Sequence, residues 1–189
     1  GIYGSNDIWS ASTNSGWFAL NTELSITQLY GADISLDGEI IVGGSQDNSY
    51  FVETNSSNNL DIWNVHSTGD GGFCTINKSN PNVIYATTQR GDIYLSTDGG
   101  QNFCHRASFR GGGQYTCCNS CTFSTSTNDS PLFIAPLKID PFNNNNVYFG
   151  GLNLWQGTSN GSTWNSIKPS INSAISAMDF SPTTASERW

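Results

Sequence analysis

The stretch STDGGQNF, Ser96–Phe103, places a carboxylate beside two glycines and ahead of an aromatic residue. Glycine adopts positive φ without a steric penalty, so Gly99 and Gly100 suit a tight hairpin turn. The carboxylate of Asp98 can close such a turn by accepting hydrogen bonds from backbone N–H groups further along it. The same carboxylate could instead serve as a catalytic acid, and the rest of the chain decides between these interpretations.

Two other stretches repeat this pattern. GDIYLSTDGGQNF (91–103) is matched by LNLWQGTSNGSTW (152–164) and, in shorter form, by NDIWSASTNSGW (6–17). Both of these copies have asparagine where the first has Asp98, and asparagine can hold a turn but cannot act as an acid. We therefore expect a structural role for Ser96, Asp98, Gly100 and Phe103, and for their counterparts Thr158, Asn160, Gly161 and Trp164. The aromatic residues at equivalent repeat positions, Trp9, Tyr94 and Trp155, are expected in the core rather than stacked on sugars.

Two further elements repeat upstream of each turn. NPNVIYATTQ (80–89), NNNVYFGGLN (144–153) and DGEIIVGGSQ (37–46) are each typical of a turn followed by a buried strand that ends in small residues. Before them come the alternating strands GFCTINKS, IAPLKIDP, YGADISLD and SAMDFSPT. One repeat is thus four antiparallel strands in about 40 to 60 residues, the unit of a β-propeller blade. The sequence predicts an all-β fold, a β-propeller of about four such blades.

The blades of this single domain can be placed on residues 1–189 by the repeat. Residues 1–25 supply the last strands of one blade, 171–189 supply only first strands, and complete blades are expected at 26–69, 70–129 and 130–170. The two ends can close a ring of four blades by pairing, or the chain can be a segment of a longer propeller. Half-blades leave sheet edges that invite another strand, which favours the segment.

STDGGQNF follows the pattern S-x-D-x-G-x-x-[WF], and it resembles the Asp box, or BNR repeat, of sialidase-like, sortilin-like and xyloglucanase-like propellers. The longer run from SITQLYGADIS to STDGGQNF is similar to secreted BNR-repeat proteins of unassigned function. The resemblance covers nearly the whole chain, although only one Asp box is complete. It implies the propeller fold and leaves the function open. The arginine motif that a sialidase carries near its start is missing.

The charge balance excludes one class of partner. Seven Lys and Arg residues against fifteen Asp and Glu give a net charge of −8, whereas nucleic-acid binding needs clustered cations. No apolar run approaches the length of a membrane span, which is about 18 residues. No cofactor or metal is expected.

The cysteines point to an oxidising, extracellular compartment. The C-x-x-C element within CCNSC is also typical of metal sites, but the second C-x-x-C pair of a zinc ribbon is missing, so disulfides are favoured. The disulfide candidates are Cys74, Cys104, Cys117, Cys118 and Cys121. The candidate N-glycosylation sites are Asn55, Asn77, Asn128 and Asn160. Most of the cysteines belong to an insertion at residues 108–131, which fits a long loop between blades and is a second candidate binding surface.

Propellers bind ligands where the ends of the inner strands and their loops converge on the central channel. The candidate binding residues there are Gln46, Asp47, Asp70, Gln89, Arg90 and Asn153. Asp47 and Asp70 are the one carboxylate pair that we consider for glycoside hydrolysis, which needs two carboxyl groups about 5 to 9.5 Å apart. The alternative is that both cap glycine-rich turns. His66 and His105 have no nucleophile motif beside them and are expected at the surface or in turns.

Two functions remain open. The favoured one is a non-catalytic extracellular propeller that binds a glycan or protein, or serves as a structural or assembly module of a larger surface protein. Its partners would then include neighbouring copies of the chain or the rest of a longer propeller. The alternative is a glycoside hydrolase of the xyloglucanase-like kind that uses Asp47 and Asp70.

Overall fold

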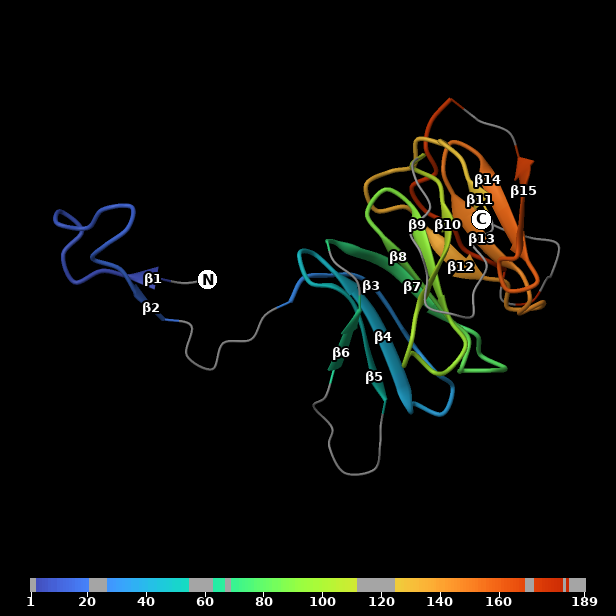
Figure 1. Cartoon of the computed structure of the whole chain (residues 1–189), viewed down its shortest axis with the longest axis horizontal. Helices are drawn as coiled ribbons and strands as arrows, with labels where there is room; N and C mark the ends of the chain where they lie inside the picture. Colours follow the sequence, from blue (N-terminus) through green and yellow to red (C-terminus); the bar gives the residue numbers. More distant parts are fainter. Residues whose placement is uncertain are drawn as a thin grey trace.

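A computed structural model describes residues 3–20, 27–54, 63–66, 69–111, 125–168, 172–181 and 183. Within these ranges every regular element is a β-strand, and most strands belong to three larger sheets (Figure 1). The prediction of an all-β fold is confirmed. In the described ranges no helix has the length and hydropathy needed to cross a membrane.

The three larger sheets are antiparallel meanders whose strands follow the order of the chain. The first sheet contains β3 (Leu29–Ile34), β4 (Ile40–Ser45), β5 (Ser49–Thr54) and β6 (Trp63–His66). The second contains β7 (Gly71–Ile76), β8 (Ile84–Thr88), β9 (Asp92–Ser96) and β10 (Cys104–Ser108), and β11 (Thr125–Ser126) lies parallel to β10. The third contains β12 (Leu137–Ile139), β13 (Val147–Gly150), β14 (Leu154–Thr158) and β15 (Thr163–Lys168). The predicted propeller of four-stranded antiparallel blades is confirmed.

The remaining strands form a short pair near the N-terminus. β1 (Tyr3–Gly4) pairs with β2 (Phe18–Ala19), and Figure 1 shows this pair lying apart from the three larger sheets. Its aromatic side chains are exposed, and Trp9 is 95% exposed. The prediction of Trp9 as a core residue is therefore wrong for this structure, because no described sheet covers the β1–β2 segment.

Two apolar clusters hold the three larger sheets together. Alternation along a strand sends successive side chains to opposite faces, so the second sheet presents one apolar face to each neighbour. Between the first and second sheets lie Val42, Tyr50, Val52, Cys74, Ile76, Ile84, Ala86 and Phe103. Between the second and third lie Val83, Tyr85, Ile93, Leu95, Ala107, Phe109, Ala135, Leu137, Ile139, Val147, Phe149 and Trp164. The sheets therefore stack face to face in chain order.

The turn at Ser96–Phe103 closes through its own side chains. Ser96 Oγ donates to Asp98 Oδ1 at 2.8 Å and accepts the Gly100 N–H at 2.9 Å. The Asp98 carboxylate also accepts the backbone N–H and the side-chain amide of Asn102, each at 2.9 Å. Gly99 and Gly100 have φ of 72° and 88°, in the left-handed region. Phe103 then packs edge-on against Tyr50 of the first sheet, with ring centroids 4.9 Å apart.

The corresponding turn of the third sheet is closed in another way. Asn160 has a left-handed φ of 56°, and its carbonyl oxygen accepts a hydrogen bond from Arg106 Nε of the second sheet at 3.1 Å. The Ser162 N–H donates to the Thr158 carbonyl oxygen at 2.9 Å. Asparagine fits this position because it tolerates the left-handed backbone, which few other residues do.

Asp98 should therefore matter for stability. Burial raises its pKa, but the hydrogen bonds from Asn102 and Ser96 outweigh burial and hold the pKa below its usual value. We expect Asp98→Ala to lower the free energy of unfolding by about 1 kcal/mol and Asp98→Asn to cost less. A carboxylate with a lowered folded pKa stabilises above its unfolded pKa, about 3.9, and loses that effect as the pH falls. Urea denaturation at pH 7 and pH 3 should show the deficit of Asp98→Ala shrinking at low pH. If Asp98→Asn proves as destabilising as Asp98→Ala, this role is contradicted.

A buried polar residue caps the turn after the first strand of each repeat. These residues are Ser35, Asn77, Asp140 and Ser181. Asn77 Oδ1 accepts the backbone N–H groups of Ser79 and Asn80, and its Nδ2 donates to the Asn144 carbonyl oxygen. The prediction of Asn77 as a glycosylation site is therefore wrong for the folded chain, since its amide is buried and used. Asn55 lies outside the described residues, Asn128 is exposed and Asn160 is half-buried.

Candidate functional site

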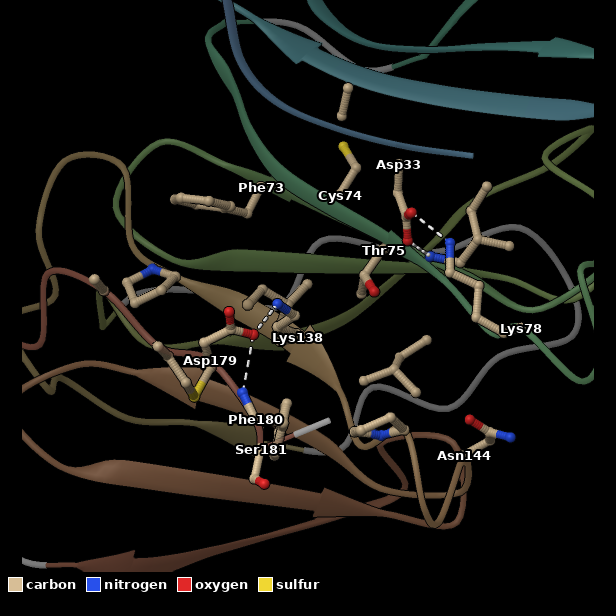
Figure 2. A pocket seen from close by; sticks show the side chains of 18 of the residues that line it. Asp33, Phe73, Cys74, Thr75, Lys78, Lys138, Asn144, Asp179, Phe180 and Ser181 are labelled. Atoms are coloured by element: carbon tan, nitrogen blue, oxygen red, sulfur yellow. Dashed lines mark hydrogen bonds and ion pairs between the residues drawn. The ribbon is translucent and has the colours of Figure 1, made fainter. Parts of the chain in front are cut away.

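The first strands of the three sheets lie side by side with residues 176–181 and line a pocket of about 600 Å³ (Figure 2). The apolar part of its lining includes Phe73, Leu137 and Met178. The charged part comes from four side chains, Asp33, Lys78, Lys138 and Asp179. We call this cavity the inner-strand pocket.

The first ion pair in the pocket joins the first and second sheets. Lys78 Nζ lies 2.5 Å from Asp33 Oδ1, and the backbone N–H of Ile76 donates to Asp33 Oδ2 at 2.8 Å. Lys78 Nζ also donates to the carbonyl oxygen of Ile34. Both oxygens of Asp33 are therefore used to attach β3 to β7, as Figure 2 shows.

The second ion pair attaches residues 176–181 to the third sheet. Lys138 Nζ contacts Asp179 Oδ1, and the Phe180 N–H donates to the same oxygen at 2.9 Å. These hydrogen bonds, from Lys138 first and Phe180 second, lower the pKa of Asp179. Asp179 is thus ionised at neutral pH, and the pocket presents matched charges beside an apolar lining.

The sequence carried a signal for these charges that we missed. When YGADISLD, GFCTINKS, IAPLKIDP and SAMDFSPT are aligned on their turn-capping residues, one position holds Asp33, Thr75, Lys138 and Asp179. All four of these residues line the inner-strand pocket, and two of them, Lys138 and Asp179, pair across neighbouring repeats. Comparison of the repeats position by position would have found both carboxylates and Lys138.

The predicted binding residues lie elsewhere, in turns that do not line the inner-strand pocket. Gln46 and Asp47 are in the β4–β5 turn, and Asp70 immediately precedes β7. Gln89 and Arg90 are in the β8–β9 turn, and Asn153 is in the β13–β14 turn. The structure brings Asp47, Asp70 and Gln89 together through hydrogen bonds to Asp70. Arg90 and Asn153 have other hydrogen-bond partners.

The contact between Asp47 and Asp70 is made by the main chain. The Asp47 N–H donates to Asp70 Oδ1 at 2.6 Å, and Asp47 has a left-handed φ of 60°. The carbonyl oxygen of Asp70 accepts the Gln89 N–H at 3.0 Å. Asp70 therefore holds the turn at Asp47 and the turn at Gln89 in place. Asp47 lines a shallow hollow of about 330 Å³ with Gln46, and Asp70 is not part of that lining.

Asn153 is anchored by an aspartate that the sequence did not single out. Asp129, which is 5% exposed, accepts the Asn153 N–H at 3.0 Å and the Trp155 Nε1–H at 2.8 Å. The Asn153 side-chain amide donates to the other oxygen of the same carboxylate. A buried carboxylate satisfied in this way fixes a turn, so Asn153 has a structural role here.

Arg90 lies at the edge of a second, smaller hollow of about 270 Å³. Arg110, Asn128 and Phe133 also line it. Arg110 Nη2 lies 2.8 Å from Asp92 Oδ2, and the Arg90 N–H donates to the Phe133 carbonyl oxygen at 2.8 Å. This hollow adjoins Gly111, the last described residue before the cysteine-rich part of the insertion.

Both histidines lie on strands rather than in turns. His105 is 3% exposed in β10, with its Nε2 3.5 Å from Asp92 Oδ1. His66 is half-buried in β6, where it stacks on Tyr50 with ring centroids 5.9 Å apart, and burial lowers its pKa. The prediction of turn positions is wrong for both histidines, since each lies on a strand. The prediction of a surface position is wrong for His105, because every residue of β10 is buried.

The cysteine prediction is corrected at Cys74. Cys74 is a buried thiol in β7, and burial raises its pKa. Cys104 is buried in β10, which is separated from β7 by β8 and β9. Three strand spacings are about 14 Å, beyond the reach of a disulfide. Cys117, Cys118 and Cys121 lie outside the described residues, so disulfides among them stay a prediction.

The comparisons with known proteins identify the fold. No protein-family model and no curated protein matches the chain. Among solved structures, it is similar to a chain of the mitotic checkpoint complex, at 12% identity and a TM-score of 0.53 over 84% of this chain and 42% of that one. It is also similar to the GH74 enzyme of Niastella koreensis (14% identity, 73% and 23% covered, TM-score 0.47) and to an ancestral GH74 enzyme (14%, 80% and 21%, 0.49). This chain thus spans less than half of each neighbour. At such identities the likeness concerns the fold alone, and of these three structures the checkpoint-complex chain, with a TM-score above 0.5, supports it.

Proposed function

We propose that this chain is a non-catalytic β-propeller module that works outside the cell, as a binding or assembly part of a secreted or surface protein. The observation that carries the proposal is how its carboxylates are used. Asp33 and Asp179 in the inner-strand pocket are each paired with a lysine, and the Asp70 carboxylate accepts the backbone N–H of Asp47. Each of these side chains has a structural partner that explains its position.

The alternative, a glycoside hydrolase, needs a different arrangement. One carboxyl group must stay protonated to act as the acid, which requires a raised pKa, and both groups must face one cleft. The pKa of Asp179 is lowered, which is the wrong direction for an acid. Asp47 and Asp70 meet through a main-chain hydrogen bond and do not line a common hollow.

The inner-strand pocket is the binding site that we favour. Its volume of about 600 Å³ lies within the usual range for ligand sites, about 300 to 1,000 Å³. An apolar lining that includes Phe73 and Met178, next to paired charges, suits a ligand with both apolar and hydrogen-bonding groups. A glycan or an extended peptide of a protein ligand has this chemistry. The extracellular location rests on the cysteine-rich insertion and on the exposed sequon at Asn128.

Filling the pocket tests this proposal. Ala177 is exposed and lines the pocket, so Ala177→Trp should block it without disturbing the core. Leu36 is 81% exposed in the β3–β4 turn and outside the pocket, so Leu36→Trp is the matched control. On an immobilised array of glycans and peptides, we expect the labelled full chain and the control to bind the same members. The Ala177→Trp protein should bind them at least tenfold more weakly, equal to about 1.4 kcal/mol. Binding that Ala177→Trp leaves unchanged, or an array with no bound member, would contradict the proposal.

A further inference from the structure

A repeated aromatic contact marks both interfaces between the larger sheets. Tyr94 of β9 lies with its ring centroid 5.4 Å from Tyr50 of the first sheet. Trp155 of β14 lies 5.1 Å from Phe109, which follows β10 of the second sheet. In each case an aromatic residue on the third strand of a sheet reaches the preceding sheet in the chain.

Phe51 occupies the same position in the first sheet. It pairs with Gly43 across β4 and β5, as Tyr94 pairs with Ala86 and Trp155 with Phe149. Its neighbours Tyr50 and Val52 belong to the cluster that faces the second sheet. Alternation along the strand therefore directs Phe51 to the opposite face, where it packs edge-on against Trp63 at 4.9 Å.

The face around Phe51 has the composition of an interface between sheets. Leu29 is 51% exposed, Ile34 49%, Trp63 43% and Val65 64%. Cross-strand pairing places Val65 opposite Phe51, and Ile34 and Trp63 on the same side through Ile41 and Glu53. We call Leu29, Ile34, Phe51, Trp63 and Val65 the outer face. Glu53 lies on the same side and is 7% exposed, so the exposed part of this face is mainly apolar. Single exposed apolar residues are ordinary, but a cluster of them on one face marks an interaction site.

We propose that the outer face binds residues 3–20 of the same chain, so that this segment packs on the first sheet as a preceding blade. Both observed interfaces join sheets that are consecutive in the chain, and residues 3–20 directly precede the first sheet. Their sequence NDIWSASTNSGW repeats the third and fourth strands of a blade. Leu20 and Leu29 are nine residues apart, a distance that extended chain spans up to about 30 Å.

The apolar side chains of the segment supply the matching surface. Ile8 is 64% exposed and lies in a turn between β1 and β2. In the repeat it corresponds to Tyr50 and Ile93, which lie on third strands and face the following sheet, so docking as a blade would extend this turn into a strand. In the structure β1 and β2 lie apart from the first sheet (Figure 1). Docking would cover Ile8 and the outer face together, and it would remove two apolar surfaces from water at once.

Charge placed on either surface tests the docking. Val65→Glu alters the outer face at an exposed position, Ile8→Glu alters the segment, and Leu36→Glu is a control on an exposed turn of the first sheet. Hydrogen exchange of the full chain should show amides of residues 3–20 exchanging at least tenfold more slowly in the natural sequence and in Leu36→Glu than in Val65→Glu or Ile8→Glu. Equal exchange in all four proteins would overturn the proposal.

The molecular mass in solution distinguishes docking of residues 3–20 on their own chain from binding of a second copy of the chain. Sedimentation equilibrium on the same samples should give the mass of one chain, 20.4 kDa, at concentrations where residues 3–20 are protected. Protection that appears only together with a dimer would mean that another copy covers the outer face. That result would overturn the assignment to the same chain.

Discussion

Replacement of Phe109 by alanine is expected to lower the free energy of unfolding by about 3 to 5 kcal/mol. Phe109 is completely buried between the second and third sheets. Its ring stacks on Phe149 with centroids 4.5 Å apart, and it contacts Trp155 at 5.1 Å and Trp164 at 5.2 Å. Truncation to alanine leaves a cavity among three rings that cannot all move to fill it.

The matched control for Phe109→Ala is Phe142→Ala. Phe142 is 46% exposed in the turn after β12, so its truncation should change the free energy of unfolding by less than about 1 kcal/mol. Urea denaturation followed by tryptophan fluorescence measures both variants. Similar losses in the two proteins would mean that the second and third sheets do not pack through Phe109.

The second large effect is expected at Gly44, where the backbones of the first and second sheets meet. An alanine Cβ at this position would lie 2.0 Å from the carbonyl oxygen of Gly72 and 2.8 Å from its nitrogen. Both atoms belong to the backbone of β7, so no side-chain rotation relieves the clash, and the two strands must separate. We expect Gly44→Ala to cost at least about 3 kcal/mol, the upper range for overpacking.

Gly38→Ala separates this clash from ordinary backbone strain. Gly38 has a φ of 78° but no atom within 4 Å of an added Cβ, so its replacement should cost only about 1 kcal/mol. Thermal unfolding by circular dichroism compares the two variants under the same conditions. If Gly44→Ala unfolds at the temperature of Gly38→Ala or above it, the close approach of β4 to the β7 backbone is contradicted.

The repeat in the sequence was sufficient to predict the sheets. Alternating apolar and polar residues, followed by turn-forming residues, recur in every blade. These signals are local, so they can be recognised without knowledge of tertiary contacts. The structure also explains why small residues follow Val42. Gly44 must be small because the β7 backbone passes against it.

The candidate site was less predictable because it depends on contacts between repeats. Asp33 and Lys78 are 45 residues apart, and their pairing follows only once the first strands are known to lie side by side. The role of Asp70 was difficult to predict for a different reason. An aspartate beside glycines has the same sequence pattern whether it caps a turn or acts in catalysis, and only its hydrogen bond to the Asp47 N–H distinguishes the two.

The central claim, that this propeller module binds without catalysing, is tested most directly by product analysis. The full chain is incubated with xyloglucan oligosaccharides, and the chain lengths of the recovered sugars are measured by mass spectrometry. The claim predicts the same lengths as in a protein-free control, for the natural sequence and for Asp70→Asn alike. Shortened oligosaccharides that disappear with Asp70→Asn or Asp47→Asn would contradict it and establish a hydrolase.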